Sequence, residues 1–199
     1  MRITAIALLA LAPLAFAPGA RAAEWTLDPE HTEIGFSVRH MMVTDVRGAF
    51  EKYTGTINVD DKDVTKAKVS VEIDVASINT KVVKRDTHLK SPEFFDAAKF
   101  PKMTFTSTQV EKGAAANTFK VTGDLSMHGV TKPVVLDVTL SDEWQDPKEW
   151  GGRTHRGVKA TGKINRQDFG VSWQTKLDKG GVVVGDEVTI AINAELIKK

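Results

Sequence analysis

The 199-residue sequence contains no cysteine. This absence excludes disulfides, thiol nucleophiles and thiolate metal ligands together. Stability must therefore come from a packed core, and about 180 residues are enough to build one.

Neither sign of charge dominates, because 27 Lys and Arg residues stand against 26 Asp and Glu residues. The chain thus lacks the broad basic field that nucleic acids or anionic lipid surfaces require. We expect no nucleic-acid partner, although a local cluster of cations could still hold one phosphate.

Only one long apolar run is present, at residues 3–17, and the small-residue site Ala20-Arg21-Ala22 follows it. This layout is typical of a secretory signal peptide, since a spanning helix needs about 20 apolar residues. We expect residues 1–22 to be cleaved off. Residues 23–199 then form one exported domain without stable membrane insertion, periplasmic in a Gram-negative source.

The common signatures of enzymes are missing, including G-x-S-x-G, a glycine-rich phosphate loop and H-E-x-x-H. The five histidines are scattered, and none has a second histidine three or four residues away. We therefore expect no catalytic residue, no cofactor and no metal site, although ligands brought together from distant strands stay open.

Apolar residues recur with period two along most of the chain, as in Ile34-Phe36-Val38 and Val134-Leu136-Val138-Leu140. This alternation indicates strands with one buried face. Turn residues such as His128-Gly129 separate the segments. The pattern predicts roughly eight to ten antiparallel strands in a barrel or sandwich.

Residues 77–100 interrupt the alternation and contain Phe94, Phe95 and Phe100. Ser91 before Pro92 is a favourable helix start, and Phe100 before Pro101 is a favourable end. These rings either plug one end of the barrel or line a cavity, because a barrel of about eight strands can hold a small ligand.

Five motifs carry a family resemblance: LDPEHTEIGFSVRH (27–40), VRGAF (46–50), RDTHLKSPEFFDAAKFP (85–101), VTGDLSMHGVTKP (121–133) and INRQDFG (164–170). With these motifs the sequence resembles the YceI-like, polyisoprenoid-binding, lipocalin-like proteins. The resemblance implies an all-β, antiparallel lipocalin-like barrel with a short helical insert near residues 80–100. It also implies an apolar lumen that captures a long isoprenoid or a similar amphiphilic lipid, as a carrier or sequestering protein.

Strand parity, together with the aromatic residues of the insert, predicts eight ligand contacts on the lumen wall: Phe36, Val38, Phe50, Phe94, Phe95, Phe105, Leu125 and Leu136. A lipid head group is expected at four polar residues: Arg39, His40, Arg85 and His88. For Arg85 the alternative is a structural ion pair with Asp86.

Two alternatives to a carrier stay open. One is an enzyme acting on an isoprenoid-type lipid, which would need His31, His40 or His128 beside a carboxylate inside the pocket. The other is a stress-related structural or partner-binding module with a filled core. A homodimer stays open as well.

Overall fold

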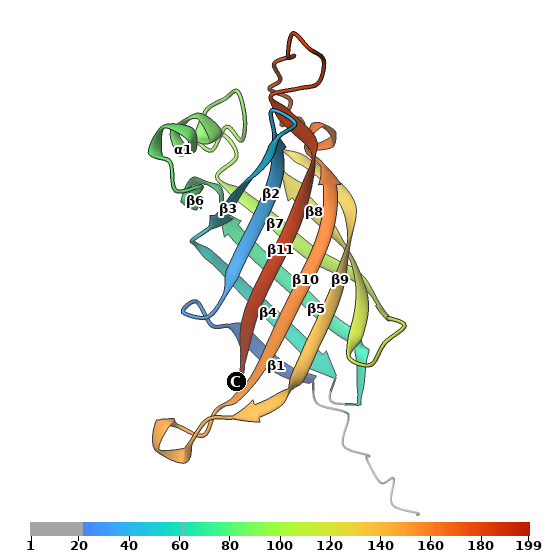
Figure 1. The fold of residues 1–199 in the computed structure, drawn as a ribbon. Helices are drawn as coiled ribbons and strands as arrows, with labels where there is room; N and C mark the ends of the chain where they lie inside the picture. The colour runs from blue at the N-terminus through green and yellow to red at the C-terminus, as the bar shows by residue number, and fades with distance from the viewer. Residues whose placement is uncertain (1–21, 61) are drawn as a thin grey trace, which may run out of the picture.

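The alternating segments form long antiparallel strands in the computed structural model, which describes residues 22–60 and 62–199 (Figure 1). The strands are β1 (Ala22–Leu27), β2 (Glu33–His40), β3 (Thr44–Phe50), β4 (Tyr53–Asp60), β5 (Asp63–Asp74), β6 (Ile78–Asn79), β7 (Lys102–Lys112), β8 (Thr118–Met127), β9 (Val130–Gln145), β10 (Thr154–Asn165) and β11 (Val184–Lys198). The predicted signal peptide falls almost entirely on residues 1–21, which lie outside the described residues. Among the described residues, no helix has the length and apolar character needed to cross a membrane.

The sheet closes on itself because β1 pairs with both β4 and β11. Within the described residues, the closed circuit runs β1-β4-β5-β7-β8-β9-β10-β11, and β2, β3 and β6 extend it beside β11. The prediction of an antiparallel lipocalin-like barrel of about eight strands is therefore confirmed. Closure leaves no free edge around the circuit, since every strand in it has two neighbours.

The β8–β9 hairpin shows how local sequence sets the strand register. His128 and Gly129 connect Met127 to its partner Val130, with φ of 53° and 78°. Two successive positive φ angles define the tight hairpin turn that matches strand twist, and glycine adopts this conformation without strain.

The predicted helical insert is present, but its helix lies earlier than Ser91. Helix α1 spans Val83–Lys90, and Ser91 is its C-cap residue, with an extended ψ of 167°. The helix start predicted at Ser91 is therefore wrong. Since a residue that precedes proline avoids the helical region, Pro92 ends this helix instead of starting another.

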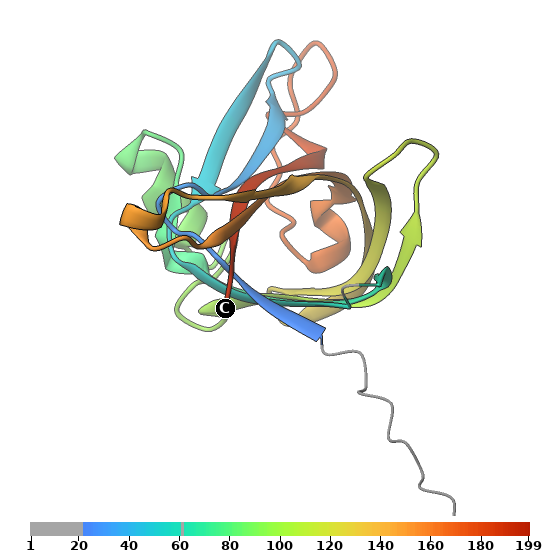
Figure 2. The ribbon, with the colours of Figure 1, turned by 90° about the horizontal axis from the view of Figure 1, so that it is seen from below.

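The described part of the chain also contains three short 3-10 helices: η1 (Val75–Ser77), η2 (Lys148–Trp150) and η3 (Arg166–Phe169). Figure 2, which looks along the barrel from below, shows η3 across its far end. Phe169 and Val171 are 2% and 3% exposed there. The end that carries α1 and η3, called the upper end as in Figure 1, is thus filled by side chains, and β1 and the C-terminus lie at the lower end.

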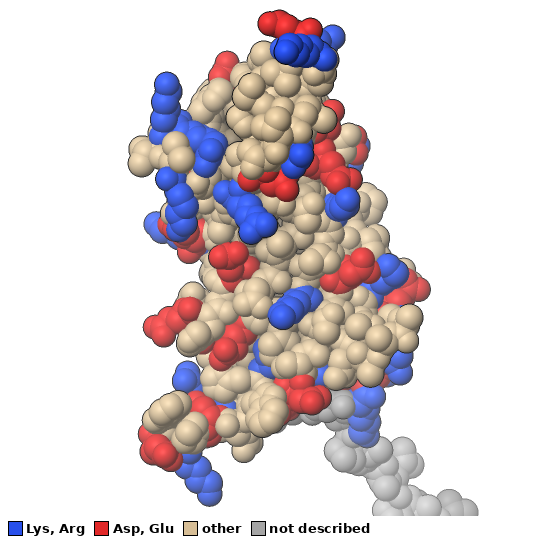
Figure 3. Space-filling view, viewed as in Figure 1, with Lys and Arg blue, Asp and Glu red and all other residues tan. Residues whose placement is uncertain are grey.

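Lys and Arg side chains alternate with Asp and Glu side chains over the face shown in Figure 3. Charges also pair across neighbouring strands, as Lys120 does with Asp137 at 2.8 Å and Lys163 with Glu187 at 2.8 Å. The outward positions of the strands are therefore mixed in charge, while the inward positions are mostly apolar.

Candidate functional site

The barrel encloses an apolar cavity of about 280 Å³. Its wall consists of the inward positions of the alternation, for example Val69, Val71 and Ile73 on β5. Small-molecule sites usually measure about 300–1,000 Å³, so this cavity lies near the lower limit. Its size favours a slender chain over a bulky ring system.

All eight residues predicted for the lumen wall line this cavity: Phe36, Val38, Phe50, Phe94, Phe95, Phe105, Leu125 and Leu136. Their contact with a ligand stays a prediction. Gly123 helps to shape the wall, because a Cβ atom there would lie 2.4 Å from Cζ of Phe105. The absent side chain leaves room for that ring.

The insert delivers two aromatic rings to the upper end of the cavity. Phe95 meets Phe50 edge to face at a centroid distance of 6.1 Å. Phe94 is 6% exposed and stacks on Trp173 at 5.2 Å. The two interpretations of these rings are compatible, because both phenylalanines close the barrel end and both line the cavity.

Thr80, which is 3% exposed, ties helix α1 to the sheet. Its hydroxyl donates to Asp86 Oδ1 at 2.5 Å and accepts from Arg85 Nε at 2.7 Å. Arg85 Nη2 also donates to the Thr80 carbonyl at 2.7 Å, and Thr80 N donates to Asp86 at 2.9 Å. Arg85 and Asp86 thus hold the insert through their shared partner Thr80.

The four residues predicted for the head group are Arg39, His40, Arg85 and His88, and the structure places each of them outside the cavity lining. Arg39 donates to Asp45 at 3.2 Å, and His88 lies 2.5 Å from Glu93. His40 pairs with Val184 at the end of β2. Their head-group role stays a prediction without support from the geometry.

Two charged residues that sequence reasoning missed, Arg156 and Arg166, line the cavity. Arg166 is 4% exposed, and it donates to the carbonyls of Gly185 at 2.9 Å and Val171 at 2.6 Å. It also pairs with Asp186 at 3.2 Å. Burial lowers the pKa of Arg166, and Asp186 opposes this shift. With these partners Arg166 serves to hold the η3 segment in place.

The alternation contained a signal for Arg156, since Arg156, Val158 and Ala160 share one parity and all line the cavity. Trp25 and Leu27 on β1 also share one parity, and both line the cavity. A parity rule extended to polar residues and to the first strand would have identified both Arg156 and Trp25.

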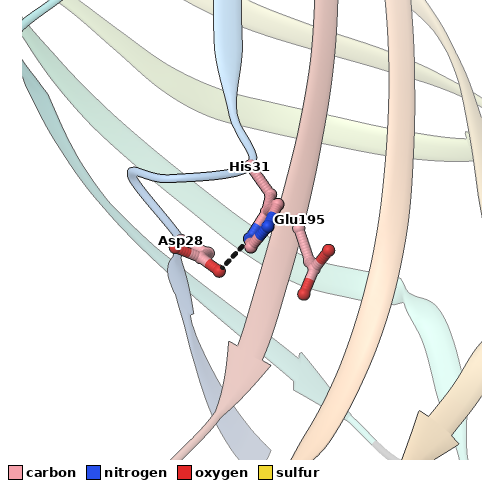
Figure 4. A group of neighbouring side chains, drawn as sticks. All are labelled: Asp28, His31 and Glu195. Carbon is pink, nitrogen blue, oxygen red and sulfur yellow. Dashed lines mark hydrogen bonds and ion pairs between the residues drawn. The ribbon is translucent and has the colours of Figure 1, made fainter.

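A second group of side chains, away from the cavity lining, consists of Asp28, His31 and Glu195 (Figure 4). Asp28 N donates to the Glu195 carbonyl at 2.8 Å, which fixes the β1–β2 turn on β11. His31 Nδ1 lies 2.8 Å from Asp28 Oδ2. This hydrogen bond lowers the pKa of Asp28 and raises the pKa of His31.

Each of these three residues offers one ligand atom, and the three atoms lie within 4.8 Å of one another. Carboxylate and imidazole donors together suit a divalent cation such as zinc. Spacing alone could not reveal this group, because Glu195 comes from the last strand of the chain. The expectation of no metal site stays untested.

A closed antiparallel barrel around an apolar cavity defines a lipocalin-like β-barrel protein. The family model of the YceI-like domain matches residues 25–196, so the chain belongs to the YceI-like family. Protein YceI of Salmonella newport is 41% identical over 165 residues, which cover 81% of this chain and 84% of that protein.

Solved structures show the same architecture. A YCEI protein of Campylobacter jejuni is 32% identical, with a TM-score of 0.68, and the match covers 81% of this chain and 90% of that one. BcnA of Burkholderia cenocepacia is 24% identical, with a TM-score of 0.72 and coverage of 85% and 98%. A polyisoprenoid binding domain from Saccharophagus degradans is 16% identical, with a TM-score of 0.58 and coverage of 88% and 98%. The last two show similarity of fold.

Proposed function

We propose that this protein binds a long-chain isoprenoid or a related amphiphilic lipid in the barrel cavity, as a periplasmic carrier or sequestering protein. The observation that carries the proposal is the apolar cavity, whose wall is built from aliphatic and aromatic side chains apart from Arg156 and Arg166. The polyisoprenoid-binding domain of similar fold supports the same class of ligand.

The apolar wall is sufficient to hold such a ligand. Burial of each methylene group contributes about 0.8 kcal/mol, while immobilising a ligand costs an estimated 4 to 15 kcal/mol. A tail that buries on the order of fifteen carbons therefore offsets the association cost without a specific head-group contact. The lining sets affinity, and polar groups at the cavity ends set orientation and selectivity.

The N-terminal sequence supports export of the protein. Its apolar run at residues 3–17 and the small residues up to Ala22 fit a cleaved signal peptide, and β1 begins at Ala22. A carrier in the periplasm would move a lipid through water while shielding its tail.

An enzyme acting on the lipid would need a histidine and a carboxylate together on the cavity wall. Among the described residues, the lining contains neither histidine nor carboxylate. His31 does pair with Asp28, but this pair lies outside the lining. The geometry therefore favours binding over catalysis.

The proposal is tested first by the native ligand. Protein purified from its own cell envelope is extracted with organic solvent, and the extract is analysed by mass spectrometry. We expect close to one long-chain lipid per barrel. If delipidated protein takes up neither this extract nor farnesol nor geranylgeraniol, the proposal fails.

A charge placed in the lining tests the site. Phe95→Asp should abolish uptake of geranylgeraniol while circular dichroism shows the strands intact, because a carboxylate in the cavity is costly to desolvate. Val83→Asp adds the same charge to the same insert at a position that is 82% exposed, and uptake should be unchanged. Equal uptake by both variants would contradict a ligand contact at Phe95.

A further inference from the structure

The two arginines of the lining lie at opposite ends of the cavity and differ in how their donors are used. Arg166, at the upper end, donates from Nε, Nη1 and Nη2 to main-chain carbonyls and to Asp186. Arg156 is paired with Leu196 on β11, close to the C-terminus and thus at the lower end. In the described part of the chain, its hydrogen bond is made by Nε, to the Ser141 carbonyl at 2.9 Å. Both terminal nitrogens therefore stay available as donors.

Arg156 points into the cavity through the regular alternation of β10, which it shares with Val158 and Ala160, and a β-bulge of β9 lies opposite it. Val158 opposes Leu140 while Arg156 opposes Glu143, so β9 contains one residue more than β10 over this step. The bulge leaves the alternation of side chains along β10 unchanged, because the register of β10 with β11 is continuous here. Its backbone is held by Gly157 N, which donates to Ser141 Oγ at 2.8 Å. The Arg156 side chain is 16% exposed, which makes it a partly shielded cation at the end of an apolar space.

Glu143 lies between two cations, Arg156 and Lys198, at the lower end of the cavity. Glu143 Oε1 lies 3.9 Å from Arg156 Nη1, beyond hydrogen-bond distance, and Glu143 Oε2 lies 4.0 Å from Lys198 Nζ. Lys198 Nζ also lies 5.4 Å from the ring centroid of Trp25, which lines the cavity. Glu143, with 44% of its side chain exposed, can turn to solvent and leave the Arg156 guanidinium to a ligand.

From this arrangement we propose that Arg156 forms an anion-binding subsite at the lower end of the cavity, which selects lipids with a carboxylate or phosphate head group. A guanidinium with both terminal nitrogens available matches the paired oxygens of such a group. The lipid tail then extends through the apolar lining toward Phe94 and Phe95. This inference rests on the proposed function and names the ligand class of the same cavity.

Three probes with one C15 chain and different head groups test the subsite: farnesyl phosphate, farnesoic acid and farnesol. Binding to the full mature protein is measured by calorimetry and by tryptophan fluorescence. We expect the anionic probes to bind roughly ten- to hundredfold more tightly than farnesol, as a charge-assisted hydrogen-bonded pair allows. A preference for one anion alone supports the subsite and identifies its head group.

Arg156→Gln should remove this preference and leave the farnesol affinity unchanged. Arg156→Lys keeps the positive charge but not the two terminal nitrogens of the guanidinium, and it should retain part of the preference for anionic probes. Lys159→Gln removes one positive charge from an exposed position on the same strand and should leave the preference intact. Thermal melts confirm that each variant is folded.

The outcomes separate this inference from the proposed function. Equal affinity of the wild-type protein for all three probes, or a preference that survives in folded Arg156→Gln, overturns the subsite while lipid binding stands. Failure of the wild-type protein to bind any probe overturns lipid binding and the subsite with it.

Discussion

Phe94 stacks on Trp173 with ring centroids 5.2 Å apart and an interplanar angle of 30°. The contact joins the insert after α1 to the segment after η3, so two stretches nearly 80 positions apart in the sequence close the upper end of the barrel together. The edge of the His88 ring packs against both, at 4.9 Å and 5.5 Å. Rings from these two segments therefore close the upper end of the barrel together.

Truncation of Phe94 should destabilise the fold. Phe94→Ala removes a ring that is 6% exposed, and we expect the free energy of unfolding to fall by about 3–5 kcal/mol, as measured by denaturant titration. The control Val83→Ala, at a position 82% exposed, should change it by less than about 0.5 kcal/mol. A loss for Phe94→Ala no larger than the control would show that the stacked contact does not contribute.

Removal of the Thr80 hydroxyl should loosen the insert. Thr80→Val keeps the side-chain shape but takes away the partner of Arg85 Nε and Asp86 Oδ1. We expect the free energy of unfolding to fall by about 1–3 kcal/mol. The rate of amide hydrogen exchange in α1 should rise in this variant. Thr87→Val, on the exposed side of the same helix, serves as the control and should have little effect. Unchanged exchange in Thr80→Val would contradict the anchoring role of this residue.

The Asp28–His31 pair should make stability depend on pH. The pKa of Asp28 is lowered from 3.8, so its contribution is present above that value and is lost as pH falls through the folded-state pKa. The pKa of His31 is raised from 6.5, so its contribution is full below that value and is lost as pH rises through the folded-state pKa. The pair should therefore stabilise the fold most at about pH 5.

His31→Gln tests this dependence. The difference in unfolding free energy between wild type and variant should be largest near about pH 5 and should shrink above the raised pKa of His31. Asp28→Asn should abolish the same dependence, and a difference that grows with rising pH would refute the assignment.

A methyl group at Gly123 should disturb the cavity wall. In Gly123→Ala the new Cβ would lie 2.4 Å from Phe105 Cζ and 2.7 Å from the Thr106 carbonyl oxygen, so the wall must shift. We expect the free energy of unfolding, measured by thermal or denaturant unfolding, to fall by about 1–3 kcal/mol. Gly157→Ala, whose Cβ would make an ordinary contact of 3.4 Å with Ser141 Oγ, should not destabilise the protein. Equal stability of the two variants would mean that Phe105 has room to move.

Helix α1 shows where local sequence was insufficient. Ser91-Pro92 is compatible with a helix start and with a helix end, and propensity alone does not distinguish the two. The contacts of Thr80 with Arg85 and Asp86 place the helix before Ser91. The residues predicted for the head group lie outside the cavity lining for a related reason, because Arg39 and Arg85 bind partners within six residues of themselves.

The period-two alternation along the chain was enough to predict the strands, their antiparallel pairing and the side on which each apolar residue lies, because side chains alternate wherever a strand forms. The folded barrel was needed to show that it retains a cavity, that Arg156 stands at its lower end, and that Glu195 meets Asp28 and His31. These facts depend on closure of the sheet, which brings together residues far apart in the chain, and no local pattern encodes such distances.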